Sequence, residues 1–230
     1  MARSPWFGWV RSCPGPSISE RDGSRLNGVL LRLAFLGVVL LILAACASSK
    51  PSKFYILTAS AAPGHSEQAL TAASGVSIGV GPVRIPDYLD RVQIVTRSTA
   101  NALQLAEYDR WAEPLDRSLP RLLAENLSAL LPADSVVAFP WPGPAHVDFQ
   151  VVVEVLQFDG TLGQKVWLEA RWTILGEGGK QVRASGHANL REPVGGASHE
   201  ALVSGWSQAL GGLSREIAAS LRTVVHPTQQ

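Results

Sequence analysis

Cys46 is the residue whose surroundings point most clearly to a chemical modification. It directly follows Leu43-Ala44-Ala45, which end an apolar run that extends from Leu33 to Ala45. An apolar run of this length, preceded by Arg32 and ended by small residues, is typical of a secretory signal that is removed from the mature protein. A cysteine directly after the small pair makes the pattern more specific and suggests covalent acylation.

The stretch from Leu43 to Cys46 resembles a bacterial lipobox, in which the signal is cut before the cysteine and the cysteine is acylated. A transmembrane anchor and a buried helix are the alternatives. As a helix the apolar run spans about 20 Å at 1.5 Å per residue, whereas a bilayer core is about 30 Å thick. Extending the run to Val29 would place Arg32 in the membrane, which is unfavourable. We therefore expect residues 1–45 to be a signal peptide.

The remaining sequence is long enough for one compact domain with its own core. The chain has 20 Lys and Arg against 19 Asp and Glu, and no block of basic residues, so nucleic-acid binding is not supported. Its two cysteines are Cys13 and Cys46. The first leaves with the signal and the second would be acylated, so we expect no disulfide. Because residues 1–28 are long for the start of a signal, we expect translation to begin near Val29.

Other residue types that carry chemistry do not form a recognisable constellation. The five histidines lack metal-ligand spacing, and no Gly-x-Ser-x-Gly motif appears. Glu154 and Glu169 fall on neighbouring predicted strands and could face each other as paired carboxylates, although exposed strand faces routinely carry such residues. We expect no catalytic site, no metal and no cofactor, and the protein is not predicted to be an enzyme.

The hydrophobic periodicity predicts both strands and helices. Alternating apolar residues indicate strands at 54–57, 76–80, 93–97, 103–107, 136–139, 147–155, 166–174 and 180–190, the last three as an antiparallel meander. Leucines three and four residues apart predict a helix that follows Pro114 and ends before Pro132. Because Pro120 is unfavourable inside a helix, either the helix proper starts near Ser118 or its first turn is kinked. A second helix is predicted from the candidate N-cap Ser198 to about Val224, with Trp206 buried on its apolar stripe.

Each of these elements has one apolar side. The pattern implies an α+β domain, a largely antiparallel sheet with two main helices packed on one face. We expect residues 46–53 to form a lipidated tether and residues 54–226 to form this single domain. Gly79 and Gly81 do not belong to a nucleotide-binding fingerprint, and we interpret them as positions of close backbone packing.

Several motifs of the mature chain together resemble the PqiC/YmbA family, also called ABC-type transport auxiliary lipoproteins. Besides the lipobox, they are Phe54-Tyr55-Ile56-Leu57, Ile78-Gly79-Val80-Gly81-Pro82-Val83, Ile85-Pro86-Asp87-Tyr88-Leu89-Asp90-Arg91, Gln93-Ile94-Val95-Thr96-Arg97 and Arg110-Trp111-Ala112-Glu113-Pro114-Leu115. The resemblance covers essentially the whole mature chain and is sharpest over 78–115. Most members have a proline where Val92 stands.

The resemblance implies a non-enzymatic periplasmic lipoprotein anchored at the outer membrane. Such proteins work with an MCE-domain protein, and often an ABC permease and ATPase, in moving lipids between the inner and outer membranes. Ala47 follows the cysteine in place of the aspartate that favours inner-membrane retention, which agrees with this location. A structural envelope lipoprotein that supports an outer-membrane assembly or the cell wall is the alternative function, and a homo-oligomer is left open.

The turn around Tyr88 and Leu89 is the candidate partner-binding site. An aromatic and an apolar residue next to Arg91 are typical anchors of a protein interface, and a surface turn has no folding reason to display them. Trp111 and Glu113 would join this site if the hairpin over 93–108 folds back beside the turn. In the alternative interpretation Tyr88 and Leu89 pack onto the domain's own core and Trp111 caps the following helix.

Overall fold

The structure is a computed structural model that describes residues 28–38, 50–60, 75–131, 133, 135–141 and 147–225. It divides into two compact units, Met1–Lys50 and Pro51–Gln230. In the first unit residues 28–38 are helical and largely exposed, and none of the described helices has the length and hydropathy to cross a bilayer. Cys46, the predicted signal cleavage site and most of the predicted tether lie outside the described residues, so their roles remain predictions.

The second unit contains all the described strands and two long helices. In chain order they are β1 (Lys53–Tyr55), β2 (Ser77–Arg84), the 3-10 helix η2 (Asp87–Leu89), β3 (Gln93–Thr99), β4 (Ala102–Trp111), α2 (Leu115–Leu130), β5 (Ser135–Ala138), β6 (Phe149–Thr161), β7 (Lys165–Gly176), β8 (Gln181–Pro193) and α3 (His199–Val225).

The strands form two sheets, where the sequence pattern predicted one. A five-stranded sheet has the order β5-β2-β6-β7-β8, and a three-stranded sheet has the order β1-β4-β3. The predicted meander of β6, β7 and β8 is antiparallel, which confirms that part of the prediction. Three pairs are parallel, namely β1 with β4, β2 with β5 and β2 with β6. The α+β fold class and the largely antiparallel pairing are therefore confirmed, with these parallel pairs in addition.

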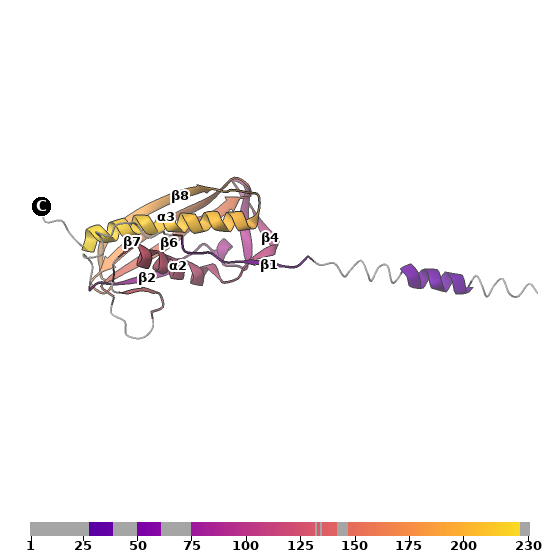
Figure 1. The fold of residues 1–230 in the computed structure, drawn as a ribbon, viewed down its shortest axis with the longest axis horizontal. Helices are drawn as coiled ribbons and strands as arrows, with labels where there is room; N and C mark the ends of the chain where they lie inside the picture. The colour runs from indigo at the N-terminus through magenta and orange to yellow at the C-terminus, as the bar shows by residue number, and fades with distance from the viewer. Residues whose placement is uncertain are drawn as a thin grey trace, which may run out of the picture. The chain divides into compact units, whose positions relative to one another are not determined.

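Both long helices pack against the five-stranded sheet and contact each other, as the sequence predicted (Figure 1). The apolar stripe of α3 is fully buried, and Trp206 is 1% exposed. Burying one such large apolar side chain contributes about 1.5–3 kcal/mol. Ser198 is the N-cap of α3, as predicted, because its Oγ accepts the N–H of Ala201 at 3.1 Å. A Cβ on Gly212 would lie 3.2 Å from Leu190 of β8, so the glycine permits close packing of α3 on the sheet.

Helix α2 begins directly after Pro114 and continues through Pro120. Two N–H groups, those of Arg117 and Ser118, close the first turn by donating to the Pro114 carbonyl at 3.1 and 3.0 Å. Pro120 therefore does not delay the start of the helix, because this first turn is already formed from Leu115. Pro120 lacks an N–H and leaves one helical hydrogen bond unmade, but it lies on the buried side of α2.

The glycines of β2 make room for two aromatic rings. A Cβ on Gly79 would lie 2.7 Å from the Trp141 ring, and one on Gly81 would lie 2.6 Å from Cβ of Phe139. Gly81 also has a φ of 125°, which side-chain-bearing residues rarely adopt. The interpretation of these glycines as sites of close packing is confirmed.

Candidate functional site

The turn that was predicted to display Tyr88 and Leu89 folds back onto the domain. Pro86 precedes η2 in an extended conformation, and its carbonyl accepts the N–H of Leu89 at 2.9 Å. Leu89 is only 2% exposed and Tyr88 is half-buried. The residues that the turn presents to solvent are therefore the charged ones, including Arg91.

Tyr88 reaches an ion pair between the two sheets. Nη2 of Arg97, on β3, lies 2.6 Å from Oδ2 of Asp159, on β6, and Nε lies 3.0 Å from Oδ1. The hydroxyl of Tyr88 donates to Oδ2 at 3.4 Å. Burial and the nearby charge of Asp159 raise the pKa of Tyr88, while the hydrogen bond to Asp159 raises the pKa of Arg97. Both side chains thus keep their protons and serve as donors to the carboxylate.

Asp159 has no solvent exposure, so its charge depends on these donors. Besides Arg97 and Tyr88, Nε2 of Gln157 donates to Oδ1 at 2.9 Å. Both carboxylate oxygens are therefore engaged and covered. The arrangement is suited to joining two sheets, because the buried charge is satisfied only while both sheets are in place.

Aromatic rings continue this junction into the core. The indole N–H of Trp206 donates to the Asp159 carbonyl at 3.1 Å. The Trp206 ring stacks on Phe158, with centroids 5.3 Å apart and planes at 23°, and lies 5.6 Å from Trp111. Trp111 is 6% exposed and packs at the end of β4. It therefore belongs to the core instead of capping α2.

Three of the five predicted partner-binding residues lie in the domain core or against it, and two do not. Tyr88, Leu89 and Trp111 all belong to the domain core or pack against it. Arg91 is exposed. Glu113 pairs with Arg121 of α2, with Oε2 and Nη2 2.8 Å apart. The exposed part of the predicted site is thus its charged rim, Arg91 and Glu113, whereas Tyr88, Leu89 and Trp111 stabilise the fold.

Sequence reasoning missed the ion pair that organises the junction. Arg97 was recognised only as the last residue of a strand motif, and Asp159 was not considered. One signal was present, since Asp159 directly follows Phe158 in a strand-forming segment and an acidic residue there requires a cation partner if buried. The partner itself is 62 positions away in the sequence, and local patterns do not reveal such pairings.

A second polar cluster attaches β1 to α3. The hydroxyl of Tyr55 donates to Oδ1 of Asp109 at 2.7 Å, and Nδ1 of His199 lies 3.3 Å from Oδ2. Burial, followed by the hydrogen bond to Asp109 and its charge, raises the pKa of Tyr55 to about 12. The strand nearest to the predicted tether is therefore fixed to the first turn of the long helix.

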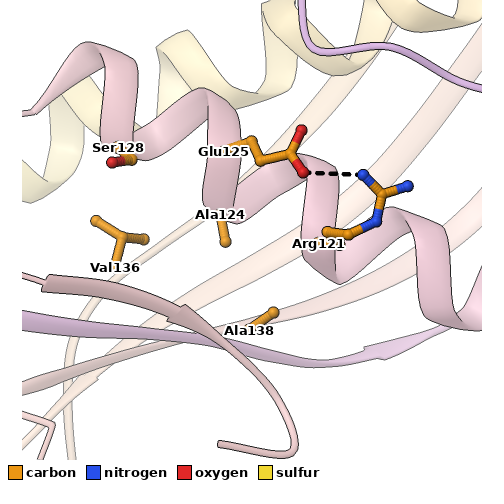
Figure 2. Close-up of a pocket in the computed structure, with 6 residues that line it drawn as sticks. All are labelled: Arg121, Ala124, Glu125, Ser128, Val136 and Ala138. Atoms are coloured by element: carbon orange, nitrogen blue, oxygen red, sulfur yellow. Dashed lines mark hydrogen bonds and ion pairs between the residues drawn. The ribbon is translucent and has the colours of Figure 1, made fainter.

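A groove of about 420 Å³ lies between α2 and β5, the last strand at one edge of the five-stranded sheet. Figure 2 shows Val136 and Ala138 of β5 facing Ala124 across this groove. At the rim Nη1 of Arg121 lies 2.8 Å from Oε1 of Glu125. The groove combines a small apolar floor with an ion-paired rim.

Among the described residues there is no group of three or more His, Cys, Asp or Glu side chains arranged to hold a metal ion. The two glutamates that could have formed a carboxylate pair each have a basic neighbour. Glu154 lies opposite Arg171, 3.6 Å away, and Glu169 pairs with His187 at 2.9 Å. Their register on β6 and β7 does not place them opposite each other.

Comparison with known proteins agrees with the resemblance found in the motifs. The chain is 27% identical to the intermembrane transport lipoprotein PqiC of Escherichia coli K12 over 181 residues, which cover 78% of this chain and 94% of that protein. PqiC of Shigella flexneri matches equally. A solved structure from Xanthomonas campestris shares the fold, with a TM-score of 0.62, 18% identity and coverage of 75% of this chain and 96% of that one.

A second solved structure, of an uncharacterised protein, also shares the fold, with a TM-score of 0.61, 23% identity and coverage of 75% and 99% of the two chains. The decisive match is to the family model described as the ABC-type transport auxiliary lipoprotein component, which spans residues 55–218. This span includes the ion-paired junction, the groove and most of α3. The chain therefore belongs to the family of ABC-type transport auxiliary lipoprotein components.

Proposed function

We propose that the protein is an outer-membrane-anchored periplasmic lipoprotein that acts as an accessory subunit of an intermembrane lipid transport system. In this proposal Cys46 is acylated, and the domain works with an MCE-domain protein and with an ABC permease and ATPase. The observation that carries the proposal is the family match over residues 55–218. The similarity to PqiC, an intermembrane transport lipoprotein, supports the transport role.

The chemistry of the domain supports an accessory role. The Asp159 carboxylate is buried and fully engaged by Arg97 and its neighbours. Among the described residues, the features open to a partner include exposed charges and the groove between α2 and β5. An accessory subunit of this kind acts by binding its partner proteins through such surface features.

We further propose that the MCE partner contacts the charged rim of the predicted site. Arg91 would make the direct contact, because arginine is enriched at interface hot spots and its side chain is exposed. Tyr88, Leu89 and Trp111 would hold this turn in place from the core side. Glu113 would contribute through its position at the start of α2, where it is partly exposed and paired with Arg121.

The test is affinity purification of the full-length protein from membranes of its native host. We expect an MCE-domain protein to co-purify, and ABC permease and ATPase subunits to follow it. Recovery of cell-wall or outer-membrane assembly proteins without an MCE protein would support the alternative structural role.

The anchor is tested separately. The parent protein should incorporate radioactive palmitate and fractionate with the outer membrane, and Cys46→Ser should abolish the labelling. Continued labelling of Cys46→Ser would refute acylation at this residue. Inner-membrane fractionation of the labelled parent would refute the proposed location.

A further inference from the structure

The start of the folded domain exposes two apolar side chains on the same side of the chain. Phe54 and Ile56 are 64% and 52% exposed, whereas Leu57 is buried and Tyr55 is half-buried. Side chains alternate along an extended chain, so Phe54 and Ile56 share the outward side. Both side chains therefore leave apolar area in contact with water, which is unfavourable. Their adjacency makes this a surface rather than a scattered exposure.

Neighbouring residues extend this surface and add basic groups to it. In the register of the three-stranded sheet, Phe54 lies opposite Arg110 of β4, and the exposed Lys53 directly precedes Phe54. Val92 is 51% exposed, and its carbonyl accepts the N–H of Trp111 at 2.7 Å, which places it beside the same stretch of β4. We call Phe54, Ile56 and Arg110 the β1 surface, and Lys53 and Val92 flank it.

The β1 surface is held firmly on the domain. The inward side of β1 is fixed by the hydrogen bond from Tyr55 to Asp109, and Asp109 in turn contacts His199. The carbonyl of Tyr55 also accepts the N–H of Ala112 at 2.8 Å. Phe54 and Ile56 are therefore presented outward by a strand that is attached to both β4 and α3.

The length of the tether determines what this surface can meet. Cys46 precedes Lys53 by seven positions, and seven residues span at most about 25 Å when fully extended. An acylated Cys46 would keep β1 within that distance of the bilayer. Phe54 and Ile56 lie only a few residues after Cys46 in the sequence, closer to it than the other exposed large apolar side chains of the folded domain. Aromatic and basic side chains together are characteristic of protein surfaces at the lipid headgroup layer.

We propose that the β1 surface lies on the headgroup layer of the membrane that holds the acyl anchor, with Phe54 and Ile56 in contact with lipid. Arg110, the register partner of Phe54, lies close to lipid phosphates in this arrangement, and Lys53 flanks the contact. The inference rests on the acylation of Cys46 proposed above and deepens it. The domain then does not hang freely from its tether but is oriented relative to the bilayer.

A thiol-reactive dye tests this contact on the full, acylated protein. The sequence has two cysteines, and acylation of Cys46 after removal of the signal leaves no other thiol, so Phe54→Cys accepts the dye alone. The matched control is Val182→Cys, because Val182 is also 64% exposed. Val182 pairs with Leu175, ten residues along β7 from Lys165, which is roughly 30 Å at the rise of a strand. Lys165 pairs with Pro193, which precedes His199 of α3, and His199 contacts the same Asp109 as Tyr55 of β1.

Both labelled proteins are reconstituted into vesicles of phosphatidylethanolamine and phosphatidylglycerol that contain a lipid-borne quencher. We expect the dye at position 54 to shift its emission to the blue and to lose most of its fluorescence to the quencher. The dye at position 182 should keep the emission of a solvent-exposed probe. Equal behaviour of the two positions would overturn the inference.

Two further results separate this inference from the proposed function. Mass spectrometry first establishes acylation. An acylated protein whose dye at position 54 stays unquenched refutes the membrane contact and leaves the anchor intact, whereas an unacylated protein refutes both. A blue shift that resists the lipid quencher and grows with protein density would assign the β1 surface to a second copy of the chain, which also overturns the proposal.

Discussion

The guanidinium of Arg97 and the carboxylate of Asp159 join the two sheets through two contacts, Nη2 to Oδ2 at 2.6 Å and Nε to Oδ1 at 3.0 Å. Arg97 belongs to the three-stranded sheet and Asp159 to the five-stranded sheet. Asp159 is fully buried, so water cannot replace its partner. Docking of the smaller sheet therefore depends on this pair as well as on apolar burial.

Removing only the cation should be strongly destabilising. We expect Arg97→Met to lower the free energy of unfolding by about 3–5 kcal/mol, because the variant leaves a buried carboxylate uncompensated. Adding Asp159→Leu should recover much of this loss. Urea denaturation measures both. The control is Arg171→Met, whose exposed pair with Glu154 should matter by less than about 1 kcal/mol; an equally small effect of Arg97→Met would contradict the role of the junction.

Trp206 should be the most sensitive position of α3. Its ring stacks on Phe158 and its N–H donates to the Asp159 carbonyl. Trp206→Ala is expected to lower the free energy of unfolding by about 3–5 kcal/mol. Trp206→Phe keeps a stacked ring and loses the hydrogen bond, so its loss should be nearer 1 kcal/mol. A denaturation midpoint equal to that of the parent in the alanine variant would show that α3 is not docked at this point.

Much of this architecture could be predicted from local patterns. Period-two alternation located β6, β7 and β8, and the leucine spacing located α2. Trp206 was expected to be buried because it falls midway along the apolar stripe of α3, and the structure confirms it. These features depend on residues a few positions apart, whose spacing directly reflects which side of an element is covered.

The division into two sheets could not be predicted in this way. The parallel pairs join segments far apart in the chain, such as Tyr55 with Trp111, and hydropathy alternation is the same for either pairing. The candidate site shows the same limit. The sequence left open whether Leu89 is displayed by its turn or packs on the core, and the structure places it in the core through a 3-10 helix. Its position depends on a cavity formed by other elements, about which the local sequence carries no information.

Gly79 should not tolerate a side chain. A Cβ there would lie 2.7 Å from the Trp141 ring, so Gly79→Ala forces β2 and the ring apart. We expect a loss of about 1–3 kcal/mol in the free energy of unfolding, measured by thermal or urea denaturation. Gly195 has no neighbouring atom within 4 Å of the equivalent position. Gly195→Ala should stay within about 0.5 kcal/mol of the parent, and similar losses for both variants would refute the steric argument.

The cluster that attaches β1 to α3 should give the protein a characteristic alkaline transition. Because the pKa of Tyr55 is raised from 10.0 to about 12, the folded state favours the neutral phenol. The resulting stabilisation is complete below pH 10 and is lost as the pH rises through about 12. Tyrosinate absorbance measures the titration. Asp109→Asn should lower the pKa of Tyr55, since the hydrogen bond to Asp109 and its charge both raise it, and an unchanged value would contradict this account.

Leu89 and Arg91 should separate folding from partner binding, since they lie two positions apart with opposite exposure. Leu89 is 2% exposed, so Leu89→Ala is expected to lower the free energy of unfolding by about 2–5 kcal/mol. Arg91 is exposed, so Arg91→Ala should leave stability within about 0.5 kcal/mol of the parent.

If the charged rim contacts the MCE partner, Arg91→Ala should weaken its capture about tenfold, equivalent to about 1.4 kcal/mol. Arg183→Ala is the matched control, because Arg183 is an exposed arginine on β8. Unchanged capture by a folded Arg91→Ala protein would move the search for the partner site to the groove between α2 and β5.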